Sequence, residues 1–472
     1  MGTIEDLRER VRGQVYTEGD DGYDEARSVM NAMHDRRPRA VVRCENAGDV
    51  MAAVDFAATN GLDLAVRGGG HSAPGFGTVD DGVVADLSGM RSVRVDPVNR
   101  TARAGGGATW GDFNAATHAF GLATTGGIIS TTGIGGLTLG GGIGYLARGL
   151  GLSCDNLISA DVVTADGRFL IASEKDNEDL FWALRGGGGN FGVVTALEYR
   201  LAPVSTVYGG PMLFELSDAT AVVAGFRDMI GDAPEQLGGF PAFQIAPPLP
   251  FIPENRHGEV FALIVGCWAG DPDRGEAEIS RFREFAPVVA EMVGPMPYPA
   301  LNSAFDALVS PGLQHYWKAN FVTELTDEAI QAHLRHAPGL PAVNSTVHIY
   351  PIDGAVHRVT PDSTAFAYRD ANFATVIAGM WRAGAERCEH RVGSFVLRRP
   401  RTALRGRRLH QLHGRRRPRP DPRQLQGQLR PPGRRETQVG PGQLLPPQPE
   451  HRALGNNQPV RRYVVRADLF RV

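Results

Sequence analysis

The chain has 472 residues, of which 42% are hydrophobic and 21% charged, and its formal net charge is −3. These values are typical of a soluble enzyme with two domains, and no apolar run reaches the length of a membrane span. The charged start, Met1–Arg8, does not resemble a signal peptide, and four scattered cysteines (Cys44, Cys154, Cys267 and Cys388) exclude a disulfide framework or a zinc site. We therefore expect a cytoplasmic protein with no membrane partner.

The first two hundred residues alternate short strands and helices. Residues 40–42 are a short apolar run that ends in two valines and predicts a strand, and residues 46–60 place apolar side chains at helical spacing before Gly61, a typical helix-ending glycine. Residues 62–66 then return as a strand. Further short strands are predicted at residues 83–87, 93–95, 101–104, 159–165, 169–172 and 193–201. Helices are predicted after Thr109, which can cap one, and at residues 179–184.

A glycine-rich block from Arg67 to Cys154 interrupts this pattern. It contains Gly-Gly-Gly-His-Ser at residues 68–72, a run with seven glycines at residues 133–144, and Gly-Leu-Ser-Cys at residues 151–154. Glycine allows a backbone to approach a ligand closely, and successive N–H groups in such loops bind anions such as a pyrophosphate. An imidazole and a thiol stand at the two ends of the block, which indicates a cofactor that is tethered to the chain.

The composition changes after Pro203. Residues 206–381 combine amphipathic helices with strand-like runs, which predicts a sheet covered by helices. The helices are expected at residues 219–230, 274–285 and 327–336, and strands at residues 261–265 and 346–350. We predict a cofactor-binding domain at residues 1–205 and a second, substrate domain at residues 206–381.

Four motifs, in matching order and spacing, resemble the FAD-binding domain of berberine-bridge-enzyme-like oxidases, within the vanillyl-alcohol-oxidase and para-cresol-methylhydroxylase class. They are residues 67–72, 133–144, 151–156 and 181–188, and residues 368–373 and 378–381 resemble the family's substrate-domain strands. The resemblance implies an α+β fold: a two-domain FAD-binding fold of the para-cresol-methylhydroxylase type, with the FAD-binding domain at residues 1–205 and an α+β substrate domain at residues 206–381.

The resemblance also implies doubly attached FAD. In the subgroup with both motifs, His71 would bond the 8α-methyl carbon of the flavin and Cys154 would bond C6, which would make the flavin more oxidising. It assigns the rest of the cofactor site to Arg67, Gly68, Gly69, Gly70, Ser72, Gly126, Gly136, Gly142, Gly144, Gly192 and Val194. No metal site is expected.

Individual residues allow other interpretations. Residues 142–147 fit a dinucleotide fingerprint, but the strand that should precede it is missing, so a nicotinamide dehydrogenase, with Asp161 as its ribose ligand, is a weaker alternative. Tyr145 and Trp110 could line the flavin or belong to the core. Cys44 and Cys267 are predicted to be buried small hydrophobic residues.

Residues 382–472 have a different composition. They contain 22 Arg, no Lys and 6 acidic residues, a balance of about +16, against about −19 for residues 1–381. Few apolar residues and no periodicity predict a disordered tail. Back-translated and shifted by one base, however, residues 438–451 can spell Lys-Trp-Asp-Pro-Gly-Asn-Phe-Phe-His-Leu-Asn-Gln-Asn-Ile, which looks like the family's terminal motif. We therefore hypothesise a one-base frameshift near residues 381 and 382.

The frameshift bears directly on catalysis. In the family, a tyrosine of an Asn-Tyr pair near the C-terminus takes the substrate's proton, and its codons would here be read as Gln428-Leu429. A basic arm that binds nucleic acid is the rejected alternative for the tail.

The resulting expectation is an FAD-dependent oxidase that transfers a hydride from an alcohol or amine C–H to FAD and uses O₂ as acceptor. Its partners would be a small-molecule substrate and O₂, with no nucleic acid and no membrane. The substrate is left open among sugars, secondary metabolites and alkaloid-like amines. The alternative is a non-catalytic FAD-binding remnant that lacks the C-terminal catalytic segment.

Overall fold

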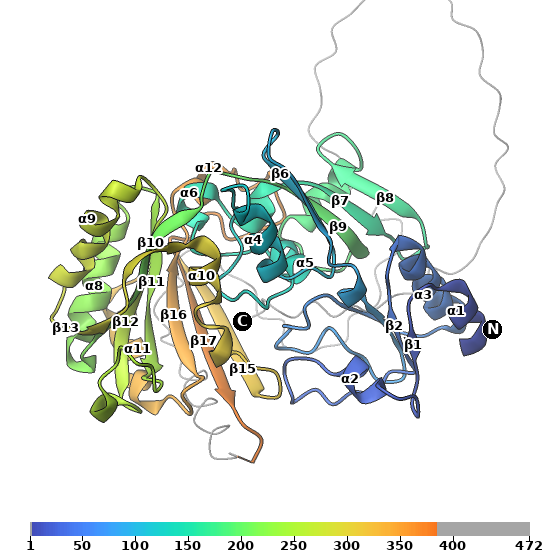
Figure 1. Ribbon diagram of the computed structural model, residues 1–472, viewed down its shortest axis with the longest axis horizontal. Helices are drawn as coiled ribbons and strands as arrows, with labels where there is room; N and C mark the ends of the chain where they lie inside the picture. Colours follow the sequence, from blue (N-terminus) through green and yellow to red (C-terminus); the bar gives the residue numbers. More distant parts are fainter. Residues whose placement is uncertain (1, 385–472) are drawn as a thin grey trace, which may run out of the picture. The chain divides into compact units, whose positions relative to one another are not determined.

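A computed structural model describes residues 2–384 and contains three β-sheets within them (Figure 1). The first sheet has the order β1 (Val15–Tyr16), β2 (Ala40–Arg43), β4 (Val83–Asp86) and β3 (Leu64–Arg67). Strands β2, β4 and β3 are parallel. Helices α1 (Ile4–Arg10) and α3 (Ala47–Asn60) pack on one face of this sheet, and α2 (Tyr23–Arg27) packs on the other.

The second sheet is antiparallel and carries the glycine-rich segments. Its order is β5 (Val93–Asp96), β6 (Thr101–Gly105), β9 (Val193–Arg200), β7 (Leu157–Val163) and β8 (Phe169–Ser173). Three helices bury apolar side chains against it: α4 (Trp110–His118), α5 (Ile134–Leu139) and α7 (Glu178–Leu184). The short helix α6 (Ala147–Leu150) and the 3₁₀ turn η2 (Ser153–Asn156) lead into β7.

The third sheet is antiparallel and has eight strands. Its order is β13 (Val288–Glu291), β10 (Thr206–Phe214), β12 (Val260–Trp268), β11 (Leu237–Ile245), β16 (Thr346–Pro351), β17 (Phe373–Trp381) and β15 (Gln314–Val322), with β14 (Gly294–Pro297) also paired to β10. The remaining helices are α8 (Ala219–Ile230), α9 (Gly275–Ser280), α10 (Tyr298–Ser303), α11 (Asp327–His336) and α12 (Ala355–Arg358).

The two faces of the third sheet have different coverings. Helices α8, α9 and α11 lie on one face, where Val347 and Ile349 of β16 join their apolar side chains in one core cluster (Figure 1, left). On the opposite face, Tyr350 and Phe240 pack with Tyr145, which follows the glycine-rich run. We call this opposite face the inner face, because it meets the segment that carries the predicted cofactor loops.

Most predicted elements are present, and the mixed α+β class is confirmed. Helix α3 begins after Asn46, whose side chain accepts a hydrogen bond from the Asp49 N–H, and ends at Gly61, which has a φ of +66°. Helix α8 spans the predicted residues 219–230. Thr109 caps α4, as predicted, in a reciprocal capping box with Asp112.

The continuous helix predicted at residues 274–285 is wrong. The structure has two 3₁₀ turns, η5 (Pro272–Arg274) and η6 (Arg281–Glu284), on either side of the short α9. Gly275 lies against Tyr208, where a Cβ atom would come within 2.4 Å of the Tyr208 Cβ. After α9 the chain tightens to i→i+3 bonding, and Phe282 packs against Phe226 with ring centroids 5.8 Å apart.

The predicted disordered tail, the frameshift and the family tyrosine expected near Leu429 lie outside the described residues, apart from residues 382–384.

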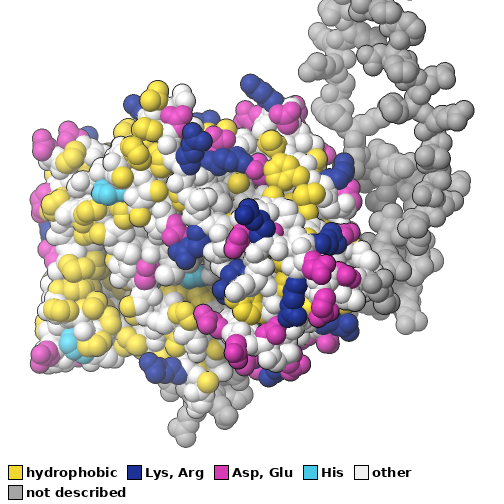
Figure 2. Space-filling view, turned by 45° about the vertical axis from the view of Figure 1, so that its right-hand side comes forward, with side chains coloured by type: hydrophobic (Ala, Val, Ile, Leu, Met, Phe, Trp, Pro, Cys, Tyr) yellow, Lys and Arg dark blue, Asp and Glu magenta, His cyan; other side chains and the backbone are white. Residues whose placement is uncertain are grey.

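On the face displayed in Figure 2, acidic and basic side chains are interspersed, so that face has no extended surface of one charge sign. The predicted domain boundary at residues 205 and 206 falls just before β10 and stays a prediction.

Candidate cofactor and substrate site

The predicted anchor His71 lies in the loop after β3, beside the glycine-rich segment. Its Nε2 is 3.0 Å from the Thr131 hydroxyl, and its Nδ1 is 3.4 Å from the Thr132 hydroxyl. The ring is half-buried, and desolvation lowers the pKa of His71 to about 4, against an opposing effect of the Asp306 carboxylate. The imidazole is therefore neutral at pH 7 and keeps a nitrogen lone pair for nucleophilic attack.

The loop from Gly68 to Ser72 presents backbone donors that no other described residue uses. None of its N–H groups donates a hydrogen bond to another group of residues 2–384. Gly69 lies so close to Gly133 that a Cβ atom on Gly69 would come within 2.3 Å of the Gly133 nitrogen, and Gly70 has a φ of +71°. Glycine at positions 69 and 70 permits this path, which leaves successive N–H groups available to an anion.

The other predicted glycines fall into two groups. A Cβ atom on Gly136, which is exposed, would meet no atom within 4 Å. The other four lie tightly against protein atoms: Gly126 against Trp110, Gly142 against Ser153, Gly144 against Gly127, and Gly192 against Val162. Close packing of the chain thus explains these four glycines, whereas Gly136 borders open space.

Two further predicted residues have structural partners. The Arg67 guanidinium donates hydrogen bonds to both carboxylate oxygens of Asp86, at 3.2 and 2.7 Å, and to the Ser28 carbonyl at 2.7 Å. Ser72 Oγ accepts a hydrogen bond from the Phe76 N–H at 3.1 Å. Val194 is buried on β9. Arg67 therefore anchors the start of the His71 loop to buried Asp86.

Cys154, the second predicted anchor, is fully buried in η2. Burial raises the pKa of its thiol, and the negative charge of Asp155 adds to the effect. The Cys154 thiol donates to Asp155 Oδ1 at 3.6 Å. Asp155 in turn accepts hydrogen bonds from Arg369 at 2.8 and 2.5 Å. The thiol is therefore protonated at pH 7, and a carboxylate oxygen that can accept its proton lies beside it.

One segment connects the two anchors. Residues 126–144 contact His71 through Thr131 and Thr132, and their other end pairs with the Cys154 loop: the Ser153 N–H donates to the Gly142 carbonyl at 2.9 Å, and the Cys154 N–H donates to the Gly141 carbonyl at 2.9 Å. The structure thus brings the separate sequence motifs together around a single glycine-rich strip.

The inner face of the third sheet adds residues that sequence analysis missed. His315 is 2% exposed, and neither of its ring nitrogens has a hydrogen-bond partner in the described part of the chain. Desolvation, with a contribution from nearby His71, lowers the pKa of His315 to about 4. On β16, His348 Nδ1 is 2.5 Å from the Tyr350 hydroxyl, and desolvation lowers the pKa of His348 to about 3.

Asn31 joins the His71 loop to β15. Its side-chain amide donates to the Ala73 carbonyl at 2.6 Å and to the His315 carbonyl at 3.0 Å, and its oxygen accepts from the His315 N–H at 2.9 Å. Nothing local in the sequence marks Asn31, because its partners are 42 and 284 residues away. For His348 and Tyr350, the available signal was the alternation of polar and apolar residues in the strand predicted at residues 346–350.

The structure places the residues whose roles the sequence left undecided. Trp110 lies in the core with Phe113 and Tyr199, and Tyr145 is 3% exposed and stacks on Phe240 of the inner face. Cys44 and Cys267 are buried, as predicted. Asp161, the ribose ligand of the nicotinamide alternative, forms an ion pair with Arg103.

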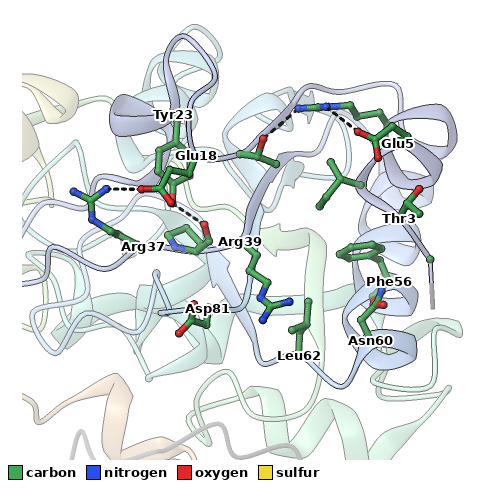
Figure 3. Close-up of a pocket in the computed structure, with 15 residues that line it drawn as sticks. Thr3, Glu5, Glu18, Tyr23, Arg37, Arg39, Phe56, Asn60, Leu62 and Asp81 are labelled. Atoms are coloured by element: carbon green, nitrogen blue, oxygen red, sulfur yellow. Dashed lines mark hydrogen bonds and ion pairs between the residues drawn. The ribbon is translucent and has the colours of Figure 1, made fainter.

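A separate surface recess of about 790 Å³ lies near the N-terminus (Figure 3). It is lined by side chains of α1, α2 and α3, among them Tyr23 and Phe56, and by the ion pair of Arg37 with Glu18. None of the predicted site residues lines it. Residues 2–384 contain no cluster of His, Cys, Asp and Glu suited to a metal ion, and no helix among them is long and apolar enough to cross a membrane.

Sequence comparison identifies relatives over most of the chain. A family profile described as an FAD binding domain matches residues 38–173. An FAD-linked oxidoreductase of Dictyostelium discoideum is 30% identical over 383 residues, which cover 80% of this chain and 81% of that protein. The (R)-6-hydroxynicotine oxidase of Paenarthrobacter nicotinovorans is 32% identical over 376 residues, covering 76% and 78% of the two chains.

Solved structures agree with this assignment. 6-Hydroxy-D-nicotine oxidase from Arthrobacter nicotinovorans superposes with a TM-score of 0.71 at 27% identity, covering 82% of this chain and 86% of that one. Xylooligosaccharide oxidase from Myceliophthora thermophila has the same fold, with a TM-score of 0.71 at 22% identity, over 84% and 86% of the two chains. The expected FAD-binding fold is confirmed.

Proposed function

Because the chain belongs to the FAD-linked oxidoreductases with a para-cresol-methylhydroxylase-type FAD-binding fold, we propose that it is an oxidase whose FAD is bound covalently to His71 and Cys154. The observation that carries this proposal is the glycine loop of residues 68–72, whose N–H groups donate to no other group of the described residues and lie beside a neutral imidazole. Two of the similar proteins are named as oxidases, one of 6-hydroxynicotine and one of xylooligosaccharides.

The residues present fit an FAD molecule. Its pyrophosphate needs several convergent donors, which the N–H groups of Gly68 to Ser72 offer without competition from other described residues. It also needs room above the backbone, which Gly136 offers, since a Cβ atom there would meet nothing within 4 Å. The segment that contains Gly136 reaches both proposed anchors.

The two proposed attachments differ in what the protein must do. His71 is already neutral at pH 7 and needs no base before its nitrogen forms a bond. Each attachment would replace a C–H bond of the flavin, with the two electrons taken up by the flavin and passed to O₂. The Cys154 thiol must first lose its proton, because the thiolate is the reactive form. Asp155 Oδ1, 3.6 Å from Sγ, is positioned to take that proton while Arg369 holds the carboxylate in place.

When bound, FAD supplies an acceptor for the hydride of an alcohol or amine carbon. O₂ then accepts the two electrons and is reduced to hydrogen peroxide. The described chain would position the substrate with the inner face of the third sheet. His348 stays neutral above about pH 3, so it acts there as a hydrogen-bond partner and not as a cation. The catalytic tyrosine of the family has its expected place outside the described residues.

Denaturing gels of purified protein test the attachment. Single variants His71→Ala and Cys154→Ala should each retain fluorescent flavin through the remaining bond, whereas the double variant should lose it. The matched controls are Cys267→Ala, another buried cysteine, and His257→Ala, a loop histidine; both should retain flavin. Wild-type protein without acid-stable flavin would contradict covalent attachment.

A second candidate is a non-catalytic FAD-binding remnant, which the Gln428-Leu429 reading at the expected tyrosine favours. The two candidates differ in turnover and not in flavin content. A remnant would carry flavin that no alcohol or amine reduces under anaerobic conditions, whereas the chain with the frame corrected at residues 381 and 382 would be reduced.

A further inference from the structure

One carboxylate beside the glycine-rich strip has no ion-pair partner among the described residues. Asp306 begins the 3₁₀ turn η7 (Asp306–Leu308), which follows α10. Its two oxygens accept hydrogen bonds from the Ser130 N–H, at 2.8 Å, and from the Ser130 hydroxyl. None of the ion pairs within residues 2–384 includes Asp306, although its side chain is only partly exposed. In this part of the chain, neutral donors alone compensate its negative charge.

The contact with Ser130 brings the carboxylate close to His71. Thr131 and Thr132, which follow Ser130, contact the two ring nitrogens of His71. Desolvation lowers the pKa of His71 to about 4, and the Asp306 charge opposes this effect. The other titratable group that faces the ring is the imidazole at position 315 of β15, which desolvation keeps neutral at pH 7. Among the described residues, Asp306 is therefore the charged group that acts on the imidazole.

Buried amide contacts hold the segment around Asp306 in place. Asn302 of α10 is fully buried, and its side-chain amide donates to the carbonyls of residues 126–127 at 3.2 Å each. At the end of η7, the Asn344 side chain donates to the Leu308 carbonyl at 2.8 Å. The carboxylate is therefore held in position before any cofactor arrives, and it needs no rearrangement to act on the imidazole.

The proposed attachment places a positive charge on the His71 ring. When a lone pair of the neutral imidazole forms the N–C bond to the 8α carbon, the ring is a cation until its own N–H proton leaves. A C–H bond of that carbon breaks, its proton is released, and its two electrons pass to the flavin and then to O₂. The ring is half-buried, so an uncompensated cation there is costly. A fixed carboxylate nearby lowers that cost.

We propose that Asp306 is a positioning residue for the covalent attachment of FAD at His71. Its carboxylate holds residues 130–132 so that both threonine hydroxyls orient the imidazole, and its charge stabilises the cationic ring while the N–C bond forms. This inference rests on the proposed function, because it assumes that His71 is an attachment site. The alternative is that Asp306 only holds the turn at Ser130, as a capping carboxylate holds a helix end.

The His71 bond can be measured alone in the Cys154→Ala background of the full chain. There, acid-stable flavin reports attachment at His71, and total bound flavin reports binding. Asp306→Asn removes the charge and keeps an acceptor for the Ser130 N–H. It should slow the formation of acid-stable flavin at least tenfold after FAD is added to flavin-free protein, with total bound flavin unchanged. Asp306→Glu restores the charge and should stay within threefold of the Cys154→Ala parent.

Two further variants separate the charge from the hydrogen bonds. Ser130→Ala removes the hydroxyl donor but keeps the carboxylate, so attachment should slow less than threefold. The matched control is Asp112→Asn, since Asp112 also accepts from the N–H and hydroxyl of one residue, Thr109, both at 2.9 Å. This control should leave the attachment rate unchanged. If Asp306→Asn does not bind FAD, Asp306→Ser removes the same charge with a smaller side chain and carries the same prediction.

The outcomes that contradict the inference are specific. Equal slowing by Asp306→Asn and Ser130→Ala would show that Asp306 only holds the turn, and equal slowing by Asp306→Asn and Asp112→Asn would show a general effect on folding. An unchanged rate in Asp306→Asn would overturn the inference alone. If the Cys154→Ala parent itself forms no acid-stable flavin, the proposed attachment at His71 is wrong.

Discussion

At the scale of single residues, Gly136 and Gly142 are glycines for different reasons. Gly136 lies in α5 beside open space, whereas Gly142 has a φ of +88° and would place a Cβ atom 2.3 Å from Ser153 Oγ. The Ser153 hydroxyl cannot easily move away, because it donates to the Thr125 carbonyl at 2.7 Å. The same substitution at the two positions should therefore have opposite effects on folding.

We predict that Gly136→Ala raises the free energy of unfolding of the flavin-free protein by up to about 1 kcal/mol, as alanine favours a helix, yet lowers flavin content severalfold. Gly142→Ala should lower the free energy of unfolding by about 2–4 kcal/mol through strain and overpacking. Urea unfolding and acid-stable flavin, measured on both variants, check this. Normal flavin content in Gly136→Ala would contradict a cofactor role for the open side of α5.

A second prediction at this scale concerns pH. The pKa of His315 is about 4 in the folded chain and 6.5 without burial, so the unfolded state binds more protons between these values and stability falls as pH drops from 6.5 to 4. His315→Phe should reduce this slope by up to one proton, about 1.4 kcal/mol per pH unit. Unfolding curves at pH 4.5, 5.5 and 7.5 measure it, and an unchanged slope would show that His315 is not buried in neutral form.

Sequence reasoning found some site residues and missed others for a physical reason. His71 and Cys154 stand inside glycine motifs, so local spacing was enough to single them out. His315, His348 and Asn31 depend on which strands become neighbours, and this follows from contacts hundreds of residues apart. These polar residues stand out because they are buried, and which residues become buried is decided only when the whole chain has folded.

At the scale of elements, residues 30–34 act as a connector between two parts of the fold. The Met30 N–H donates to the Gly70 carbonyl at 3.2 Å, and the Ala32 N–H donates to the Leu313 carbonyl at 2.9 Å. Asn31, 1% exposed, adds the side-chain hydrogen bonds to Ala73 and His315. The connector therefore fixes the His71 loop relative to the start of β15.

Asn31→Ala should lower the free energy of unfolding by about 2–4 kcal/mol, because it removes the partner of the buried N–H and C=O groups of His315. The fraction of covalent flavin should fall as well, since the His71 loop loses its attachment to β15. The comparison is Asn60→Ala, which removes one hydrogen bond to the Phe56 carbonyl and should cost less than about 1 kcal/mol. Equal losses in the two variants would argue against the connector.

Elements with strong local signals were predictable, and those shaped by tertiary contact were not. Helix α3 has a capping asparagine, a regular apolar face and a terminal glycine, all of which are readable from the sequence. The region of α9 has a comparable apolar pattern, but the close approach of Gly275 to Tyr208 and the burial of Phe282 divide it into short turns. The pairing order of the third sheet has no local signal at all.

At the scale of the whole molecule, the charge distribution divides the chain. Residues 1–381 carry about −19 and residues 382–472 about +16, and the shifted frame of the second part restores a family-like terminal motif. We predict that resequencing the coding DNA across residues 381 and 382 reveals one missing or added base. The corrected chain should then turn over substrate at least a hundredfold faster than the chain as given. If resequencing instead confirms the reading frame as given, the proposed oxidase lacks the tyrosine that the family resemblance leads us to expect.

The central claim is covalent FAD at His71 and Cys154, and peptide mapping of the denatured protein by mass spectrometry tests it most directly. The account predicts one FAD joined to two peptides, one containing His71 and the other containing Cys154. Flavin attached at neither residue, with both peptides found at their unmodified masses, would contradict it.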